Sequence, residues 1–371
     1  MRADASPEIG GGHVMRCLAL AGRLRERGVS VSFLARIDGL DWLRSQVVDG
    51  GYALLSPAST PGRLVALAEA HRLDALVLDS HTLAPGCSEA LRSAGVVTAA
   101  VVDGDRRGQS ADLFIDQDPA ADDGTDTRGN GDGRADHDGF LLRGGLRHAL
   151  VREEIVSLRE RPTAPPTGGT PHVLCFFGAT DPASAAPVAV GLLLATGLPV
   201  RATVVSARAE LRRQVLELPT AAGQSVTVIG PTTELPALVR SADLVVAAAG
   251  SSVLELLCLG AAVALVSVAD SQRPTYDALV ERDLAVGLGG LLSLRSDSAA
   301  AARATASLRA LVISPSKRSG LAARGRAAVD GGGCVRVAEA LLGLVRGRRS
   351  SGRATGRAAG PPARVTGGWK G

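Results

Sequence analysis

Short apolar runs alternate with amphipathic helical patterns along most of this 371-residue chain, and this alternation constrains the fold more than any other feature. The apolar runs have the length and β-branched content of buried parallel strands, and the patterns between them have helical period. In the first half we expect strands at 29–35, 52–55, 74–79, 96–103 and 111–115, and helices after Gly12 and at 41–49, 62–71 and 87–94. In the second half we expect strands at 172–177, 202–206, 225–229 and 244–248, and helices at 183–195, 209–218, 235–242 and 252–259. The alternation predicts an α/β fold with parallel sheets covered on both faces.

The chain is too long for one ordinary core, so we expect two domains. A stretch rich in Pro, Thr and Gly at 161–170 has no periodicity and is typical of a linker. It separates an N-terminal Rossmann-like domain, 1–160, from a C-terminal one, 171–344. The N-terminal strand must be very short, since only residues 1–5 precede the glycine loop described below, unless part of it is missing from the sequence.

Two segments are predicted to be disordered. Residues 116–139 are dense in Asp and Gly, but no register supplies the Gly and Glu of a calcium-binding loop. Residues 345–371 hold seven basic and no acidic residues and lack apolar periodicity. With Trp369 as its only aromatic residue, we expect this tail to be solvated and not to bind nucleic acid.

The composition limits the compartment and the kinds of metal site. Hydrophobic residues make up 46% of the chain, but no apolar run reaches membrane-spanning length and no signal-peptide pattern opens the sequence, so we expect a cytoplasmic protein with no membrane partner. The five cysteines are scattered without a CxxC pair, which favours free thiols over disulfides or zinc.

A glycine-rich loop followed by a histidine is the first candidate functional motif. Gly10, Gly11 and Gly12 leave room for close approach of a ligand, and His13 then opens a helix whose N-terminus attracts anions. An imidazole at such a place suits acid/base chemistry. A dinucleotide-binding fingerprint fails because Arg16 stands where its third glycine would be. The alternative is a tight turn with a histidine that only caps or packs.

Further candidates follow the ends of predicted strands, where ligands of parallel sheets bind. Asp79, Ser80 and His81 end one strand and face the same gap as His13, although His81 is equally compatible with a surface loop. Gly178, Thr180 and Asp181 form a loop whose hydroxyl and free N–H groups suit phosphate.

The loop at 249–255 completes this set. Gly250, Ser251 and Ser252 suit a pyrophosphate, and Glu255 suits the hydroxyls of a ribose. The alternative for Ser252 and Glu255 is a plain capping box.

The order of these motifs resembles the UDP-sugar hydrolases of pseudaminic acid biosynthesis and related spore-coat polysaccharide proteins. The resemblance rests on RADAS at 2–6, IGGGHVMRCLALA at 9–21, LRGGLRHALVREE at 142–154, GSSVLE at 250–255 with the later Gln272, and DGGGCVRVA at 330–338. The chain departs from the family pattern at His81 and His148, where tyrosine is usual, and at Ser271, where asparagine is usual.

The resemblance implies a glycosyltransferase-B-like fold with a central cleft and hydrolysis of a UDP-linked diacetamido-trideoxyhexose at the anomeric C–O bond, with inversion and release of UDP. His13 would be the catalytic base, without a metal or cofactor, in a monomer that binds only the UDP-sugar and UDP. The implied substrate-binding residues are Gly11, Gly12, Arg16, Asp79, His81, Arg152, Gly178, Thr180, Asp181, Gly250, Ser251, Ser252, Glu255, Ser271 and Gln272. For Arg152 the alternative is an ion pair within a helix. Two other functions stay open: a glycosyltransferase with a sugar or lipid acceptor, and an inactive protein that binds a nucleotide or carbohydrate.

Overall fold

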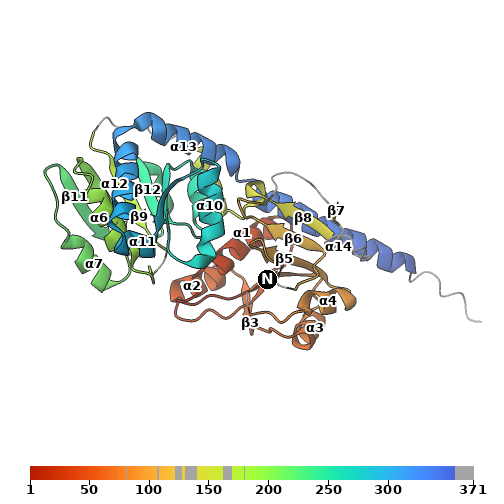
Figure 1. The fold of residues 1–371 in the computed structure, drawn as a ribbon. Coiled ribbons are helices and arrows are strands. Elements are labelled where there is room, and N and C mark those ends of the chain that lie inside the picture. The colour runs from red at the N-terminus through yellow and green to blue at the C-terminus, as the bar shows by residue number, and fades with distance from the viewer. Residues whose placement is uncertain are drawn as a thin grey trace, which may run out of the picture.

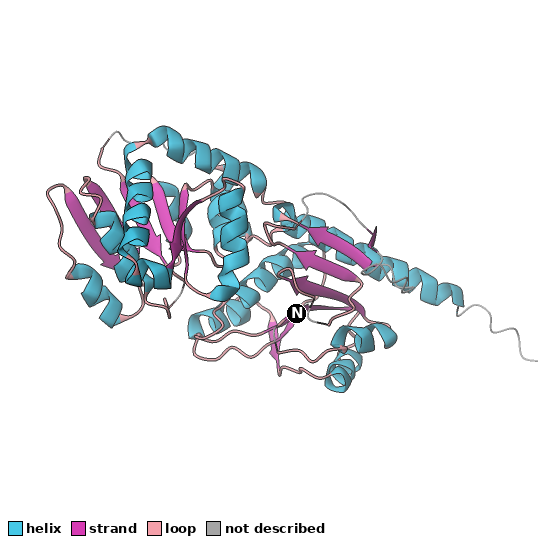
Figure 2. Ribbon diagram, viewed as in Figure 1, coloured by secondary structure: helices cyan, strands magenta, loops and turns pink. Residues whose placement is uncertain are grey.

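Two parallel sheets, each at the centre of its own lobe, organise the computed structural model (Figure 1). The structure describes residues 1–80, 82–106, 108–121, 128–129, 140–161, 169–178 and 180–355. Helices cover both faces of each sheet (Figure 2), which confirms the predicted α/β class with two Rossmann-like units. Helix on sheet is the arrangement in which all-parallel strands bury both faces.

The first sheet has the strand order β3-β2-β1-β4-β5-β6-β8-β7. Its strands are parallel except for β7, which pairs antiparallel with β8. They are β1 Arg2–Ala3, β2 Ser32–Leu34, β3 Ala53–Leu55, β4 Ala75–Asp79, β5 Val97–Val102, β6 Leu113–Asp116, β7 Arg128–Gly129 and β8 Phe140–Gly144. The helices of this lobe are α1 Gly12–Glu26, α2 Asp41–Asp49, α3 Pro61–Ala70, α4 Cys87–Ser93 and α14 Gly333–Thr355. The predicted N-terminal strand is therefore present with two residues, held between β2 and β4.

The second sheet has the order β11-β10-β9-β12-β13-β14, all parallel. Its strands are β9 His172–Phe176, β10 Val200–Val205, β11 Gln224–Ile229, β12 Leu244–Ala248, β13 Val263–Ser267 and β14 Val286–Gly290. Its helices are α5 Glu153–Glu160, α6 Ala185–Leu194, α7 Ala209–Leu216, α8 Leu235–Ser241, α9 Val253–Leu259, α10 Arg273–Glu281, α11 Leu291–Ser296, α12 Ser298–Ile313 and α13 Pro315–Ala328. Local signals fit several of these boundaries, since Asp297 caps α12 and Ser314 with Pro315 opens α13.

The chain crosses between the lobes twice, and this moves the predicted domain boundaries. Helix α5, placed before the linker, packs through Ile155 into the core of the second lobe. Helix α14 returns to the first lobe, where Val337 and Leu341 join its core. The N-terminal unit therefore does not extend to residue 160, and residues 333–344 belong to the first lobe. The reason is that each of these helices packs against the sheet on which its apolar face is buried.

The prediction that 345–371 is disordered is wrong for 345–355, which continue α14. Arg348 bonds the carbonyl of Val96 and the carboxylate of Asp112, and Arg349 pairs with Asp74. These contacts with the first lobe extend the helix beyond its apolar part. Residues 356–371 lie outside the described residues.

Two other predicted segments are only partly described. Of the acidic insertion at 116–139, Asp116 ends β6 and Arg128–Gly129 forms β7, so these parts are ordered against the prediction. Residues 122–127 and 130–139 lie outside the described residues, as do 162–168 of the linker.

Candidate functional site

In each lobe the strand order reverses between two neighbouring strands, and the loops that follow these strands carry the candidate residues. In the first lobe the strands are β1 and β4, paired at Ala3 and Asp79. In the second lobe they are β9 and β12, paired at Phe176 and Ala247. Ligands of open α/β sheets bind at such points, beyond the carboxyl ends of the strands.

The two loops of opposite lobes meet at Gly12 and Ser251. A Cβ atom added to Gly12 would lie 2.5 Å from Ser251 Oγ and 3.5 Å from Ser251 Cβ. A Cβ at this position would force the Ser251 hydroxyl or the loops to move, since real Cβ atoms do not come so close to another atom. The histidine loop and the serine loop, 239 positions apart in sequence, therefore face one another across the junction of the lobes.

His13 is oriented by the buried carboxylate of Asp79 at the end of β4. Its Nδ1 lies 2.7 Å from Asp79 Oδ1, and its side chain is 13% exposed. An ionised Asp79 can only accept a hydrogen bond, so Nδ1 carries the hydrogen and, in the neutral ring, Nε2 carries the lone pair. That tautomer is the one a general base on the Nε2 side requires.

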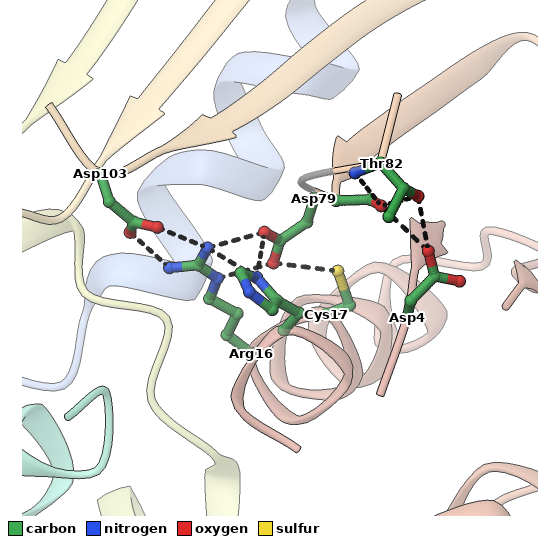
Figure 3. Close-up of polar contacts among 8 residues, drawn as sticks. Asp4, Arg16, Cys17, Asp79, Thr82 and Asp103 are labelled. Carbon is green, nitrogen blue, oxygen red and sulfur yellow. Dashed lines mark hydrogen bonds and ion pairs between the residues drawn. The ribbon is translucent and has the colours of Figure 1, made fainter. Parts of the chain in front are cut away.

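Arg16 holds Asp79 in place from the next turn of α1. Its Nε donates to Asp79 Oδ2 at 2.6 Å, its Nη2 to Asp79 Oδ1 at 2.6 Å, and its Nη1 to Asp103 Oδ1 at 2.7 Å (Figure 3). Burial alone raises the pKa of Asp79, but the charge and hydrogen bonds of Arg16, together with His13, outweigh it and hold that pKa well below its usual range. Asp79 therefore stays a carboxylate at any working pH.

Asp79 ends β4 beside His13, as the sequence predicted, and Arg16 lies against both. Arg16 and Asp79 were both expected to contact substrate, but Arg16 is 6% and Asp79 0% exposed, and their polar atoms are engaged with each other, with His13 and with Asp103. They are positioning residues for His13. The other half of this network, Asp103, was missed in the sequence, although it stands at the end of the predicted strand 96–103, where such a side chain is expected.

The loop after β4 is tied to the loop after β1. Ser80 Oγ donates to Asp4 Oδ2 at 3.0 Å. Thr82 Oγ1 donates to the same oxygen at 3.2 Å (Figure 3). Arg2, itself buried, pairs with the other oxygen of Asp4. His81 lies between these anchored residues but outside the described residues, so its predicted role stays a prediction.

In the second lobe, Gly250 and Gln272 are neighbours. A Cβ on Gly250 would lie 3.5 Å from Gln272 Nε2, while Gln272 Oε1 accepts from the N–H of Val268. Ser251 and Ser271 are exposed, and Ser252 is half-buried. The structure thus brings the predicted 250–252 loop and the 271–272 pair to one place.

Glu255 is held by Arg152 from the first crossing between the lobes. Arg152 Nε and Nη2 donate to the two carboxylate oxygens of Glu255, each at 2.7 Å. The capping-box alternative is wrong, because the Ser252 side chain makes no capping bond. The alternative for Arg152 was an ion pair within its own helix. The pair of Arg152 with Glu154 is of that kind, but its pair with Glu255 joins it to another helix, α9. Contact of either side chain with substrate stays a prediction.

The loop after β9 is only partly open. Gly178 is exposed with φ +81°, and Thr180 is half-buried. The Asp181 carboxylate is buried and accepts from the N–H groups of Ala185 and Ala186. The expectation of free N–H groups at the start of α6 is therefore wrong for these two, because Asp181 caps the helix.

No group of three or more His, Cys, Asp or Glu side chains that suits a metal ion occurs within the described ranges. All five cysteines are buried and free. Among the described helices, none combines the length and the apolar character needed to cross a bilayer.

The sequence matches no protein-family model and no curated protein, but the fold matches solved structures over nearly its whole length. MurG of Acinetobacter baumannii has a TM-score of 0.65 at 14% identity, covering 92% of this chain and 98% of that one. UDP-GlcNAc 2-epimerase of Neisseria meningitidis, bound to UDP-GlcNAc, has a TM-score of 0.58 at 12% identity, covering 92% and 98%. The spinosyn rhamnosyltransferase SpnG has 0.55 at 17%, covering 94% and 100%. The chain therefore has a glycosyltransferase-B-like fold of two Rossmann-like lobes.

Proposed function

We propose that this protein is an enzyme that acts on a nucleotide sugar, and specifically that it hydrolyses a UDP-sugar at the anomeric C–O bond with release of UDP. The observation that carries the proposal is the meeting of Gly12 and Ser251, which puts an oriented histidine of one lobe opposite a hydroxyl-rich loop of the other. Solved structures of the same fold include enzymes whose names state sugar transfer or epimerisation of a UDP-sugar. The motifs at 9–21 and 250–272 favour the hydrolase within this group.

In the proposed reaction a water oxygen attacks the anomeric carbon, and His13 Nε2 takes up one of its protons. The bond between that carbon and the diphosphate oxygen breaks at the same time, and its electron pair leaves with UDP. Asp79 stabilises the imidazolium that forms, since it lies 2.7 Å from Nδ1 and remains ionised. Attack from the face opposite to the leaving UDP inverts the anomeric centre.

The nucleotide is proposed to lie on the second lobe. The hydroxyls of Ser251, Ser252 and Thr180 would donate to the diphosphate. Glu255, fixed by both donors of Arg152, retains lone pairs on each oxygen that accept from ribose hydroxyls. A single carboxylate held in this way suits a vicinal diol.

The test is the release of UDP from the donor alone, with water as the only acceptor. Free sugar plus UDP supports the hydrolase. UDP that appears only after an acceptor is added supports a glycosyltransferase, the second candidate, which the name of the structurally similar rhamnosyltransferase SpnG favours. UDP binding without cleavage of any donor in a panel of UDP-sugars supports an inactive binding protein.

His13→Ala tests the base. We expect UDP release to fall by about 10²- to 10⁴-fold, the usual range for loss of a general base, while calorimetric UDP affinity is preserved. The matched control is His71→Ala, since His71 is an exposed residue at the end of α3. Undiminished turnover of His13→Ala would refute the assignment of His13.

A further inference from the structure

Trp42 lies half exposed against the loop that carries His13. A Cβ added to Gly11 would be 3.7 Å from both Cη2 and Cζ2 of the indole, so the ring packs on the glycine backbone two positions before His13. Helix α2, which carries Trp42, lies beside α1 on the side of the first lobe nearer to the second lobe (Figure 1). Nothing in the sequence motifs pointed to this residue.

The exposure of this ring is exceptional for the protein. The chain contains only two Trp, two Tyr and five Phe residues. In the part of the chain that the structure describes, every other aromatic side chain is buried, whereas Trp42 is 44% exposed. An exposed indole leaves apolar surface in water that contact with a ligand would cover.

Trp42 stands on an anchored helix, and the glycine loop on which it packs carries a second exposed apolar side chain. Leu43, 0% exposed, anchors α2 in the core, and a Cβ on Gly11 would lie only 3.0 Å from its Cδ2. Ile9, 50% exposed, stands on a turn closed by the Gly10 N–H to the Ser6 carbonyl at 2.8 Å. Gly10 has φ +76°, a conformation that glycine adopts without strain. Two exposed apolar side chains thus stand on ordered backbone, one on the loop that carries His13 and one packed against that loop.

We propose that Trp42, which packs on the loop that carries His13, is the platform on which the sugar ring of the nucleotide sugar stacks. This rests on the proposed function, because it places the sugar between the first lobe and the nucleotide on the second. Pyranose rings present faces of C–H groups to aromatic rings, and a deoxygenated sugar with a methyl group offers more apolar surface to cover. The platform would select for such a sugar and fix its anomeric carbon near His13.

A fluorescence titration tests the platform without relying on turnover. Trp369→Phe leaves Trp42 as the single tryptophan, and His13→Ala in the same chain prevents consumption of the donor. The probes are UDP alone and UDP-2,4-diacetamido-2,4,6-trideoxy-β-L-altropyranose. We expect the sugar nucleotide to shift Trp42 emission to shorter wavelength and UDP alone to leave it unchanged.

Kinetics on the otherwise unaltered chain give the second measurement. We expect Trp42→Ala to raise KM for the UDP-sugar about tenfold with UDP affinity unchanged, and Trp42→Phe to retain most of the binding. Leu216→Ala is the matched control, since Leu216 is 59% exposed on α7 of the other lobe.

The outcomes separate this proposal from the proposed function. Emission that does not respond to saturating sugar nucleotide, together with an unchanged KM in Trp42→Ala, overturns the platform while cleavage of the donor still supports the hydrolase. Failure of UDP itself to bind overturns both. A response of Trp42 in the titration, together with no cleavage of the donor by the chain that retains His13, supports the platform and contradicts the hydrolase.

Discussion

Replacing Gly12 by alanine tests whether the two lobes meet in the active enzyme as they do in the structure. The new methyl group would lie 2.5 Å from Ser251 Oγ, well inside van der Waals contact, but 3.5 Å from Ser251 Cβ, which is an ordinary contact. The added methyl therefore conflicts with the hydroxyl alone. Gly12 is the first residue of α1, where alanine is a good helix former, so the first lobe itself should fold unchanged.

The magnitude follows from the ways in which the conflict is relieved. Either the Ser251 side chain turns to another rotamer, or the lobes separate slightly, and each costs about 1 kcal/mol or somewhat more. Both responses move the hydroxyl away from the proposed diphosphate. We therefore expect kcat/KM of Gly12→Ala to fall by about five- to tenfold, which corresponds to about 1–1.4 kcal/mol.

Ser251→Ala removes the conflicting atom and completes a double-mutant cycle. Alone, it should lower kcat/KM through loss of a hydrogen bond to a charged group, worth about 1.5–3 kcal/mol. In the Ser251→Ala background, Gly12→Ala should not lower kcat/KM further, so the coupling free energy between the two positions should be about 1 kcal/mol.

The assay is UDP release, with thermal unfolding as a check on the fold. Gly62→Ala is the matched control, because Gly62 also stands in the first turn of a helix but has open space around it. Additive effects of Gly12→Ala and Ser251→Ala on kcat/KM would mean that the two loops do not meet during catalysis. That result would refute the contact between Gly12 and Ser251 as a feature of the active enzyme.

Three further predictions concern stability. Asp79→Asn removes a fully buried charge shared by Arg16 and His13, so the free energy of unfolding in urea should fall by about 3–5 kcal/mol, and an unchanged value would contradict the buried ion pair. Because the pKa of Asp79 is lower in the folded than in the unfolded state, its contribution is complete above about pH 5 and is lost as the pH falls; acid unfolding should be shallower in Asp79→Asn, and equal slopes would argue against this. Arg348→Ala, which loses the bond to Asp112, should speed hydrogen exchange in the last turns of α14, while unaltered exchange would show that these contacts do not hold the helix.

The period of apolar residues predicted a strand or helix well where the residues of that element alone determine it. The strand expected at 74–79 is β4 Ala75–Asp79, and the helix expected at 41–49 is α2 with the same bounds. A buried strand and an amphipathic helix each carry their period in consecutive residues, so the neighbours along the chain are sufficient. Strand alternation then gave the fold class, because parallel strands need helices on both faces.

Local pattern failed where distant parts of the chain decide. The end of α14 has no apolar period, yet Arg348 and Arg349 find acidic partners on the first lobe and extend the helix. The N–H groups at the start of α6 were expected to be free for phosphate. Asp181, which has a positive φ, instead directs its buried carboxylate to the N–H of Ala185 in this helix. Such outcomes depend on which groups meet in space.

The sequence alone determined the α/β class, the two units, and His13 as the candidate base at the start of a helix. Only the tertiary structure decided that Arg16 and Asp79 orient this histidine and that Gly12 meets Ser251. The physical reason is that hydrogen bonds and steric contacts depend on distance in space, and no period along the chain records a partner 63 or 239 positions away.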